Sequence, residues 1–354
     1  MCGGLLSGVV YNLLVIALVV EVVVGGFFGD EGKGSVVGYL SLKDNPAICV
    51  RGGVGPNAGH TVIYRGKEYR MRQIPSGVIN EKCRLLIGPG VLVNPNVIFD
   101  EIKRYSIDPR RVGIDRKAGI IESGHIDRER GSKHLKDKIA STLSGCGEAN
   151  VDRARRKLRL AEEIESLKKF ITDVPEEIWE AIDNKKTVIV EGTQGTFLSL
   201  FHGTYPYVTS KDVCASAICS DVGIGPKHVD EVIVVFKSYV TRVGTGPLPG
   251  ELSWDEIKRR GWEEYGTVTR RPRRAAPFNF DLARRAVKLN SATQIALTKL
   301  DILFPKTAHV RSWDELSKEA KDFILEIERR LGVPVTIIRT GPDVGDTIDR
   351  REHV

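Results

Sequence analysis

The sequence predicts an α/β protein with a large central, mostly parallel β-sheet, helices on both faces, and peripheral helical and loop insertions in a single domain. Short apolar runs rich in β-branched residues recur along the chain, and segments with helical periodicity separate them. Strands that alternate with helices are typical of parallel sheets. Gly-rich or polar motifs follow several of these runs. Because ligands of such sheets bind on the loops after the strands, we expect these motifs to form one site.

The first predicted strand is Val19–Val24, which is almost wholly apolar and runs directly into a Gly-rich turn. That pattern is typical of a strand buried on both faces. Further strands are expected at Ala47–Val50, Arg84–Ile87, Thr187–Val190, Glu231–Val235, Gln294–Thr298 and Val335–Ile338. Helical periodicity covers Phe280–Leu289 and Trp313–Leu331. Residues 127–170 are highly charged and helical in pattern, which predicts a helical excursion from the domain.

The chain begins with an apolar segment that precedes the first motif. The run Val9–Val24 is shorter than the roughly 20 apolar residues of a spanning helix, and it contains Asn12 and Glu21. A signal peptide would require a basic residue before the run, and no Lys or Arg precedes it. We therefore expect residues 19–354 to form the domain, residues 1–18 to be an N-terminal extension, and no membrane to be a partner.

Composition bounds the classes of function. With 354 residues, 41% hydrophobic and 28% charged, the chain is neither fibrous nor disordered. The balance of 53 Lys and Arg against 46 Asp and Glu gives a net charge of +7, which suits an acidic ligand such as a nucleotide. No nucleic acid partner is expected, because the basic cluster at 270–274 lacks the interleaved aromatics that stack on bases. Six scattered cysteines without a CxxC pair predict buried, reduced thiols.

The motif GGFFGDEGKGS, Gly25–Ser35, follows the first strand. A strand, a glycine loop and a helix together place backbone N–H groups around a phosphate, and Lys33 adds a positive charge. The motif is not a Walker A loop, because Phe27 stands at the first Gly position and Gly34 at the Ser/Thr position. The adjacent carboxylates of Asp30 and Glu31 beside a phosphate indicate a metal ion or proton transfer.

Two further motifs follow predicted strands. RGGVGPNAGHT, Arg51–Thr61, is rich in small residues that allow close approach of a ligand, and it carries His60 as a candidate acid or electrophile. EGTQGTFLSLFHGTYPYVTS, Glu191–Ser210, offers Gln194 and Thr209 as hydrogen-bond donors for a polar ring or a phosphate. A hairpin-rich surface loop is the alternative interpretation of the second motif.

The last two motifs indicate recognition of anions and of a purine. YGTVTRRPRR, Tyr265–Arg274, has four arginines with two threonines, which suits carboxylate or phosphate. A solvated basic face is the alternative. ALTKLD, Ala296–Asp301, ends a strand with Thr-Lys-x-Asp, the pattern in which an Asp carboxylate accepts from guanine and a Lys packs across the base.

Taken together, GDEGKG, NAGHT, EGTQGT with HGTYPYVTS, TRVGTGPLP, VTRRPRR, LTKLD and RTGPD occur in the order found in adenylosuccinate synthetases. From about Val19 to the C-terminus the chain resembles the short archaeal-type form of that family. The resemblance implies GTP- and Mg²⁺-dependent ligation of IMP and L-aspartate to adenylosuccinate through 6-phosphoryl-IMP. It further implies a cytoplasmic homodimer whose partners are these three substrates.

The resemblance also implies roles for individual residues. Asp30 is the base that removes the N1 proton of IMP, and protonated His60 steadies charge on the transferred phosphoryl group. Asp30 and the carbonyl of Gly59 hold one Mg²⁺. The implied IMP-binding residues are Asp30, Lys33, Asn57, His60, Thr142, Arg156, Gln194, Thr209 and Arg271. The implied aspartate-binding residues are Thr267, Thr269, Arg271 and Arg273, in a substrate loop at 265–276. The implied GTP-binding residues are Gly29, Glu31, Gly32, Lys33, Gly34, Ser35, Gly59, His60, Thr61, Arg273, Lys299, Asp301, Thr340 and Gly341.

Arg156 matches an arginine that reaches IMP in the neighbouring subunit, which makes the homodimer part of the implied function. The chain departs from the family pattern at Phe27-Phe28, where Gln-Trp is usual, and at Arg270 and Pro272 in the substrate loop.

A GTP-binding regulatory switch with slow GTP hydrolysis is the alternative function. It explains LTKLD and the glycine loop, but not Asp30, His60 and the arginine loop together.

Overall fold

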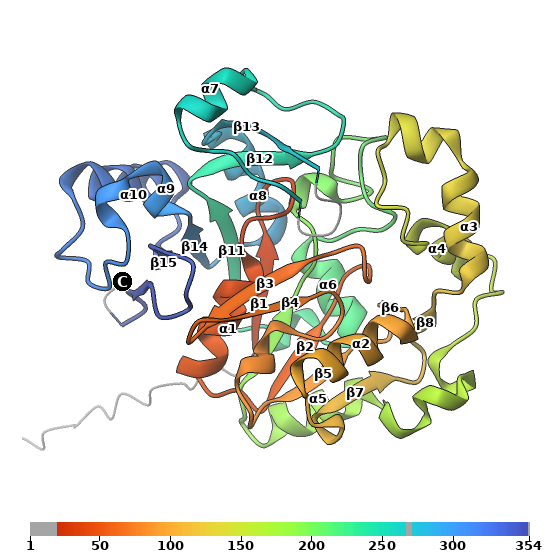
Figure 1. Ribbon diagram of the computed structural model, residues 1–354. Coiled ribbons are helices and arrows are strands. Elements are labelled where there is room, and N and C mark those ends of the chain that lie inside the picture. Colours follow the sequence, from red (N-terminus) through yellow and green to blue (C-terminus); the bar gives the residue numbers. More distant parts are fainter. Residues whose placement is uncertain (1–19, 267–270, 353–354) are drawn as a thin grey trace, which may run out of the picture.

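The computed structural model describes residues 20–266 and 271–352, and a ten-stranded sheet forms its centre (Figure 1). All neighbouring strands of this sheet are parallel except the terminal pair β15 and β16. The predicted α/β class is therefore confirmed. In spatial order the strands are β16 (Thr347–Asp349), β15 (Val335–Arg339), β14 (Gln294–Thr298), β11 (Glu231–Lys237), β1 (Val20–Gly25), β10 (Val188–Glu191), β2 (Ile48–Arg51), β5 (Arg84–Ile87), β7 (Val112–Asp115) and β9 (Ile171–Thr172).

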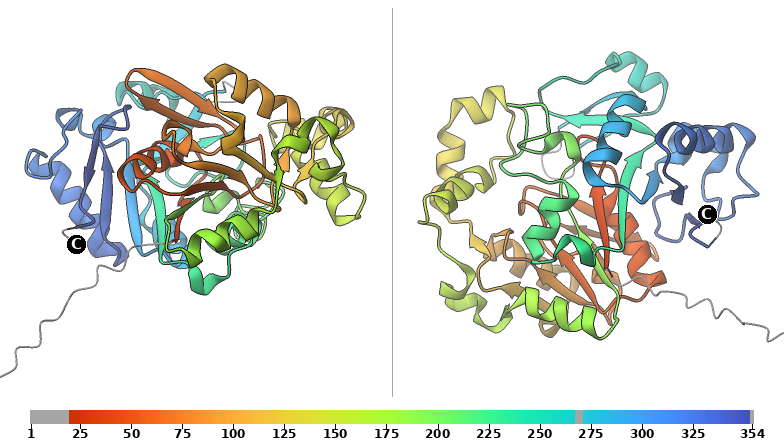
Figure 2. Two further views of the ribbon diagram at one scale, coloured as in Figure 1. Left: turned by 90° about the horizontal axis from the view of Figure 1, so that it is seen from below. Right: turned by 180° about the vertical axis from the view of Figure 1, so that it is seen from behind.

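The hydrophobic core lies in two layers, one on each face of the sheet. Because side chains alternate along a strand, Val22 and Val24 of β1 belong to one layer and Val23 to the other. The first layer is covered by α5 (Val174–Asp183), α6 (Ala215–Val222), α8 (Phe280–Asn290) and α10 (Lys318–Leu331). The second is covered by α1 (Lys33–Lys43) and α2 (Pro95–Tyr105). The view from behind in Figure 2 shows α5, α6 and α8 together on their face.

The remaining elements lie around the sheet. Two antiparallel hairpins, β3 (His60–Tyr64) with β4 (Lys67–Met71) and β12 (Tyr239–Val243) with β13 (Arg273–Pro277), flank it. β6 (Leu92–Val93) pairs with β8 (Gly119–Ile120), and the short helices are α3 (Ser123–Gly131), α4 (Cys146–Ala154), α7 (Trp254–Arg259) and α9 (Leu300–Leu303). Single 3₁₀ turns occupy Ser76–Ile79, Pro109–Arg111, Ala161–Glu163, Glu165–Phe170, Thr196–Leu198, Pro226–His228 and Pro305–Thr307.

The predicted excursion at 127–170 projects from one side of the sheet in Figure 1 as α3 and α4. It is only partly α-helical, since a π-helical turn covers His134–Lys138 and 3₁₀ turns follow α4. The domain limits, including residues 1–18, remain an expectation, because residues 1–19 lie outside the described part.

One helix boundary differs from expectation. Helix α10 begins at Lys318 rather than Trp313, because the Ser317 hydroxyl caps it by accepting from Ala320 N at 3.3 Å.

The unusual Phe27-Phe28 pair is buried: Phe27 contacts Phe236, while Arg242 lies over the Phe28 ring at 4.4 Å. These two aromatic side chains therefore belong to the core.

Within residues 20–266 and 271–352, no helix combines the length and the apolar character needed to cross a membrane. The five cysteines of this part of the chain are buried free thiols, as the spacing predicted.

Candidate active site

The loops that carry the motifs leave one edge of the sheet. β14, β11, β1, β10 and β2 are consecutive and parallel, so their carboxyl ends lie side by side (Figure 1). The phosphate-loop motif follows β1, the motif with His60 follows β2, the motif with Gln194 follows β10, and Lys299 follows β14. The sheet therefore brings together four motifs that are separated by up to 270 residues in sequence, as the α/β prediction required.

In the phosphate loop, the side chain of Glu31 lies inside the turn. One carboxylate oxygen accepts from the backbone N–H of Phe27 at 3.0 Å and of Gly29 at 2.8 Å. The other oxygen pairs with Lys33 Nζ at 3.0 Å, and both side chains are about 98% buried. Gly29 and Gly32 take positive φ, which lets the loop wrap tightly around this carboxylate. The loop therefore points N–H groups at an anion, and that anion is a residue of the chain itself.

Asp30 forms an ion pair with Arg273 of the substrate loop. Its carboxylate lies 3.0 Å from Arg273 Nη2, and about a quarter of the side chain is exposed. Lys33 pairs with Glu31 and donates to the carbonyl of Gln194. The Arg273 guanidinium also contacts Glu264, which lies just before the substrate loop.

His60 lies between the phosphate loop and a buried charged cluster. It packs against the first turn of α1, where a Cβ on Gly34 would approach the His60 Cβ to 2.8 Å. Its Nδ1 contacts the Glu191 carboxylate and lies 2.6 Å from Arg51 Nη1. Glu191 also accepts from the Ser76 hydroxyl at 2.6 Å and from Ser76 N at 2.7 Å.

This environment determines the charges of the cluster. Burial, and to a smaller extent Arg51, lower the pKa of His60 to about 4, while Glu191 opposes the shift. Burial acts to raise the pKa of Glu191, but Arg51, His60 and Ser76 outweigh it and hold that pKa at about 2. The protein groups alone therefore keep the ring neutral at pH 7, whereas a protonated ring was expected. Protonation needs additional negative charge near the ring.

The expected IMP-binding residues on the loops after β2 and β10 lie together. Asn57 Nδ2 is 3.4 Å from Thr209 Oγ1, which joins the two loops. Asn57 Oδ1 is buried without a hydrogen-bond partner in the described part of the chain. Gln194 has a positive φ of 57°, and its side-chain oxygen accepts from Thr193. A buried amide oxygen without a partner costs free energy, so Asn57 Oδ1 is available to accept from a polar ligand or a water.

The other expected IMP and aspartate residues come from the periphery. Arg271 Nη2 donates to the carbonyls of Ala140 at 2.8 Å and Ser141 at 3.3 Å, so Thr142 lies near the substrate loop. Thr142 Oγ1 bonds Ser144 Oγ at 2.9 Å. Arg156 follows α4 and is exposed, and among the described residues its guanidinium donates to the nearby carbonyl of Ala154 at 3.0 Å. Thr267 and Thr269 lie outside the described residues.

The residues expected to bind guanine lie where β14 and β15 end. Lys299 has a positive φ of 60° at the start of α9, its carbonyl accepts from Ser238 Oγ at 2.7 Å, and Asp301 lies in the first turn of that helix. Thr340 follows β15 and donates to Val310 O at 2.6 Å. Gly341 lies so close to Asp346 that a Cβ would approach a carboxylate oxygen to 2.4 Å. α9 packs against β15, which brings the two halves of the pocket together.

Sequence reasoning assigned no role to Arg51, Glu191 or Glu264. Arg51 and Glu191 are the last residues of β2 and β10 and face each other in the parallel register. A charged residue at the end of an otherwise apolar strand was the available signal, but the register that pairs the two is not visible in the sequence. Glu264 accepts from Lys237 Nζ at 2.9 Å and contacts Tyr239 and Arg273.

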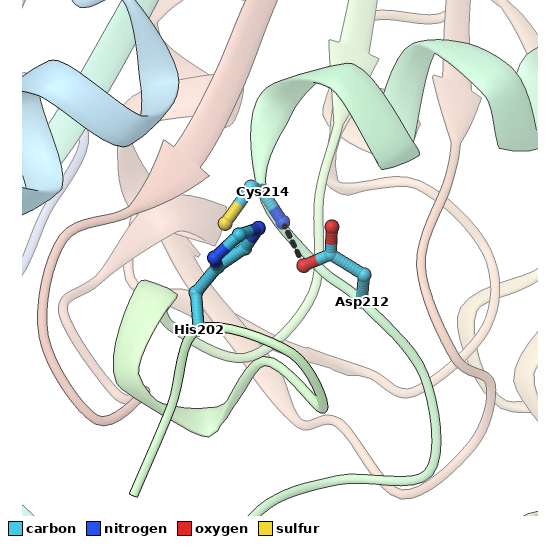
Figure 3. A group of neighbouring side chains, drawn as sticks. All are labelled: His202, Asp212 and Cys214. Carbon is cyan, nitrogen blue, oxygen red and sulfur yellow. Dashed lines mark hydrogen bonds between the residues drawn. The ribbon is translucent and has the colours of Figure 1, made fainter.

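A second group of side chains, whose atoms are of the kinds that bind metal ions, lies on the loop before α6 (Figure 3). It consists of His202, Asp212 and Cys214. Asp212 Oδ1 accepts from the backbone N–H of Val213 at 2.7 Å and of Cys214 at 3.2 Å, which fixes the start of α6. Burial and Asp212 raise the pKa of the Cys214 thiol to about 12, so the thiol stays protonated. We interpret the group as a hydrogen-bonded helix start.

The sheet order and the phosphate loop after β1 define an α/β nucleotide-binding protein. A sequence model of the family "Adenylosuccinate synthetase" matches residues 22–164 and 158–305. The chain therefore belongs to the adenylosuccinate synthetase family.

Individual relatives agree with this assignment. The chain is 54% identical to the adenylosuccinate synthetase of Thermococcus onnurineus over 334 residues, covering 94% of this chain and 98% of that protein. It is 52% identical to the Methanocaldococcus jannaschii protein of the same name over 343 residues, covering 96% and 99%. Among solved structures, the fully ligated adenylosuccinate synthetase of Plasmodium falciparum has a TM-score of 0.87 and 26% identity, covering 94% of this chain and 100% of that one.

Proposed function

We propose that the protein joins IMP to L-aspartate with GTP as co-substrate, releasing adenylosuccinate, GDP and phosphate. The observation that carries the proposal is the edge of the sheet where the phosphate loop, His60, the Asn57–Thr209 pair and Lys299–Asp301 converge. Membership of the family supports the same reaction. The O6 of IMP is a poor leaving group, and phosphorylation by GTP makes it a good one that the aspartate amine displaces.

Asp30 is the proposed base for the N1 proton of IMP. Its partly exposed carboxylate supports this role, because a base must be accessible to the substrate, and Arg273 lies 3.0 Å from it. The proposed part of His60 is to bind the transferring phosphoryl group as an imidazolium. The phosphates of GTP supply the negative charge that the ring needs for protonation, because phosphoryl transfer depends mainly on positioning and charge neutralisation.

The residues proposed for Mg²⁺ fit that ion. Mg²⁺ prefers oxygen ligands and usually combines one or two carboxylates with substrate phosphates. Asp30 offers an accessible carboxylate and Gly59 a backbone carbonyl, at the two loops that follow β1 and β2. When bound there, the ion would neutralise charge on the phosphates of GTP.

The remaining roles are assigned from the matched motifs. Lys33, Gln194, Thr209, Thr142 and Arg271 are proposed to bind IMP, the substrate loop at 265–276 to bind aspartate, and Lys299, Asp301, Thr340 and Gly341 to bind guanine. Arg156 is proposed to reach IMP in a partner subunit, which its exposed position on the excursion supports. The buried free thiols support a cytoplasmic location, where cysteines stay reduced.

A GTP-hydrolysing switch is not favoured. A switch needs the phosphate loop and the guanine pocket, but it gives no role to the unpaired Asn57 oxygen beside Thr209. Following absorbance while IMP, aspartate, GTP and Mg²⁺ are combined tests the proposal. We expect adenylosuccinate only when all four are present. GTP hydrolysis that needs neither IMP nor aspartate would contradict the ligase.

A further inference from the structure

The histidine proposed to bind phosphate is held by a carboxylate that is fully buried. Glu191 ends β10, and its side chain is 0% exposed. One oxygen accepts from Ser76 Oγ at 2.6 Å and contacts His60 Nδ1, and the other accepts from Ser76 N at 2.7 Å. Arg51 Nη1 lies 3.2 Å from the first oxygen. Both oxygens are therefore fixed in position.

These contacts determine which ring nitrogen of His60 carries the proton. An ionised carboxylate can only accept, so a close contact with Nδ1 requires a proton there. Arg51 Nη1 also lies 2.6 Å from Nδ1, but the Glu191 oxygen is nearer to Nδ1 and is itself an acceptor for Nη1 at 3.2 Å. The other donors of Arg51 have acceptors too, since Nη2 donates to Ile74 O at 2.9 Å and Nε to Gln73 O at 3.3 Å. In the neutral ring the lone pair is then on Nε2, which is the nitrogen that takes up the second proton in the proposed imidazolium.

We propose that Glu191 is the positioning residue for His60: it holds the proton on Nδ1, fixes the ring plane, and leaves Nε2 as the nitrogen available to the phosphate. The packing of His60 against Gly34, in the first turn of α1, puts the ring beside the phosphate loop. A carboxylate behind a histidine has the same effect in the Ser-His-Asp triad, where it keeps the imidazole in one tautomer. The inference rests on the proposed function, since that function gives His60 its task.

A double-mutant cycle separates positioning from a merely structural role. Glu191→Gln keeps the size of the side chain and removes its charge, and we expect kcat to fall roughly 100-fold or more while KM for GTP and IMP changes by about twofold or less. In a His60→Asn background, Glu191→Gln should then cost only about threefold more, because two residues that act as a unit are not additive. Additive losses, or an effect confined to KM, would overturn the proposal.

Asp115→Asn is the matched control. Asp115 is likewise a buried carboxylate at the carboxyl end of a parallel strand, β7, and it accepts from Lys117 N at 2.8 Å and Val174 N at 3.0 Å. We expect this change to leave kcat within about twofold in both backgrounds. Glu191→Asp, which keeps the acceptor, should recover part of the lost kcat; an activity no better than that of Glu191→Gln contradicts the proposal.

A second measurement does not depend on turnover. In protein labelled with ¹⁵N-histidine, a proton shared with a buried carboxylate should give a downfield Nδ1–H resonance that disappears in both His60→Asn and Glu191→Gln and persists in Asp115→Asn. If the resonance is present but no adenylosuccinate forms, the proposed function fails and the positioning contact stands. If adenylosuccinate forms without the resonance, the assignment of Glu191 is wrong.

Discussion

The site has a phosphate half, formed by the phosphate loop and the His60–Glu191 cluster, and a half proposed to bind IMP and aspartate. The two halves differ in how completely their polar groups are paired within the chain. In the phosphate half, Glu31 pairs with Lys33 and two backbone N–H groups, and Glu191 has contacts on both oxygens. In the IMP and aspartate half, Arg156 is exposed and bonds only its own segment, and Asn57 keeps a buried unpaired oxygen in the described chain. The first half is prearranged by strands of the sheet, whereas the second depends on substrates and, as proposed, on a second subunit.

The largest effect should come from the phosphate half. Asp30→Asn keeps the size of the side chain but removes the proposed base, so we expect kcat to fall by roughly a thousandfold with an unchanged fold. Steady-state rates and a thermal unfolding curve measure the two outcomes. His60→Asn should behave similarly. A rate above a tenth of the wild-type value in the Asp30 variant would contradict the expectation that the largest effect on catalysis comes from the phosphate half.

A smaller effect is expected from Arg156→Leu on the IMP half. Loss of a charge-assisted contact to phosphate should raise KM for IMP by roughly 10- to 100-fold, since such bonds contribute about 1.5–3 kcal/mol. Arg155→Leu, a change at the neighbouring exposed arginine, is the control and should leave KM nearly unchanged. Titration with IMP measures both.

Mixed dimers test the same arginine more sharply. In a dimer of one Asp30→Asn chain and one Arg156→Leu chain, one of the two sites has both an intact Asp30 and an intact arginine from its neighbour. Mixing the two purified variants should therefore restore activity at low IMP. A mixture no more active than its components would contradict a shared site.

The smallest effect on catalysis is expected at the opposite edge of the sheet, where Glu21 lies near the start of β1. Its side chain is buried, and one of its oxygens has no partner among the described residues, in contrast to Glu31 and Glu191. Burial, with Asp44 acting in the same direction, raises the pKa of Glu21 to about 7. The folded protein therefore holds a proton that the unfolded chain, with an ordinary pKa near 4.5, has already lost.

The free energy of unfolding should consequently decrease as the pH rises from about 4.5 to 7, by up to a few kcal/mol from this group. Denaturant unfolding at several pH values measures the slope. Glu21→Gln should flatten it and leave turnover at pH 7 unchanged. An equal slope in the variant would show that other groups cause it.

The sequence was sufficient for seven of the ten strands of the sheet and for the motifs on the loops that follow them, but it did not indicate β7, β9 or β16. Val19–Val24 was expected and Val20–Gly25 is observed, because an apolar run ending in glycine marks a strand directly. It was not sufficient for contacts between strands. The pairing of Arg51 with Glu191 depends on register, and the pairing of Asp30 with Arg273 joins segments 243 residues apart. The sequence could not show the charge of His60 in the free protein, because the cluster behind it comes from other strands and a 3₁₀ turn.

The carboxylate of Glu31 in the phosphate loop has a consequence for selectivity against simple salts. Any anion that enters the loop must displace the Glu31 carboxylate, whose local concentration is high because it belongs to the same chain. Free phosphate or sulfate has no second group whose binding could compensate for that displacement. On the proposed assignment, a guanine nucleotide would also gain energy from contacts of its base with Lys299 and Asp301. We therefore expect the loop to discriminate against the inorganic anions of the cell and to admit phosphate groups that arrive attached to guanosine.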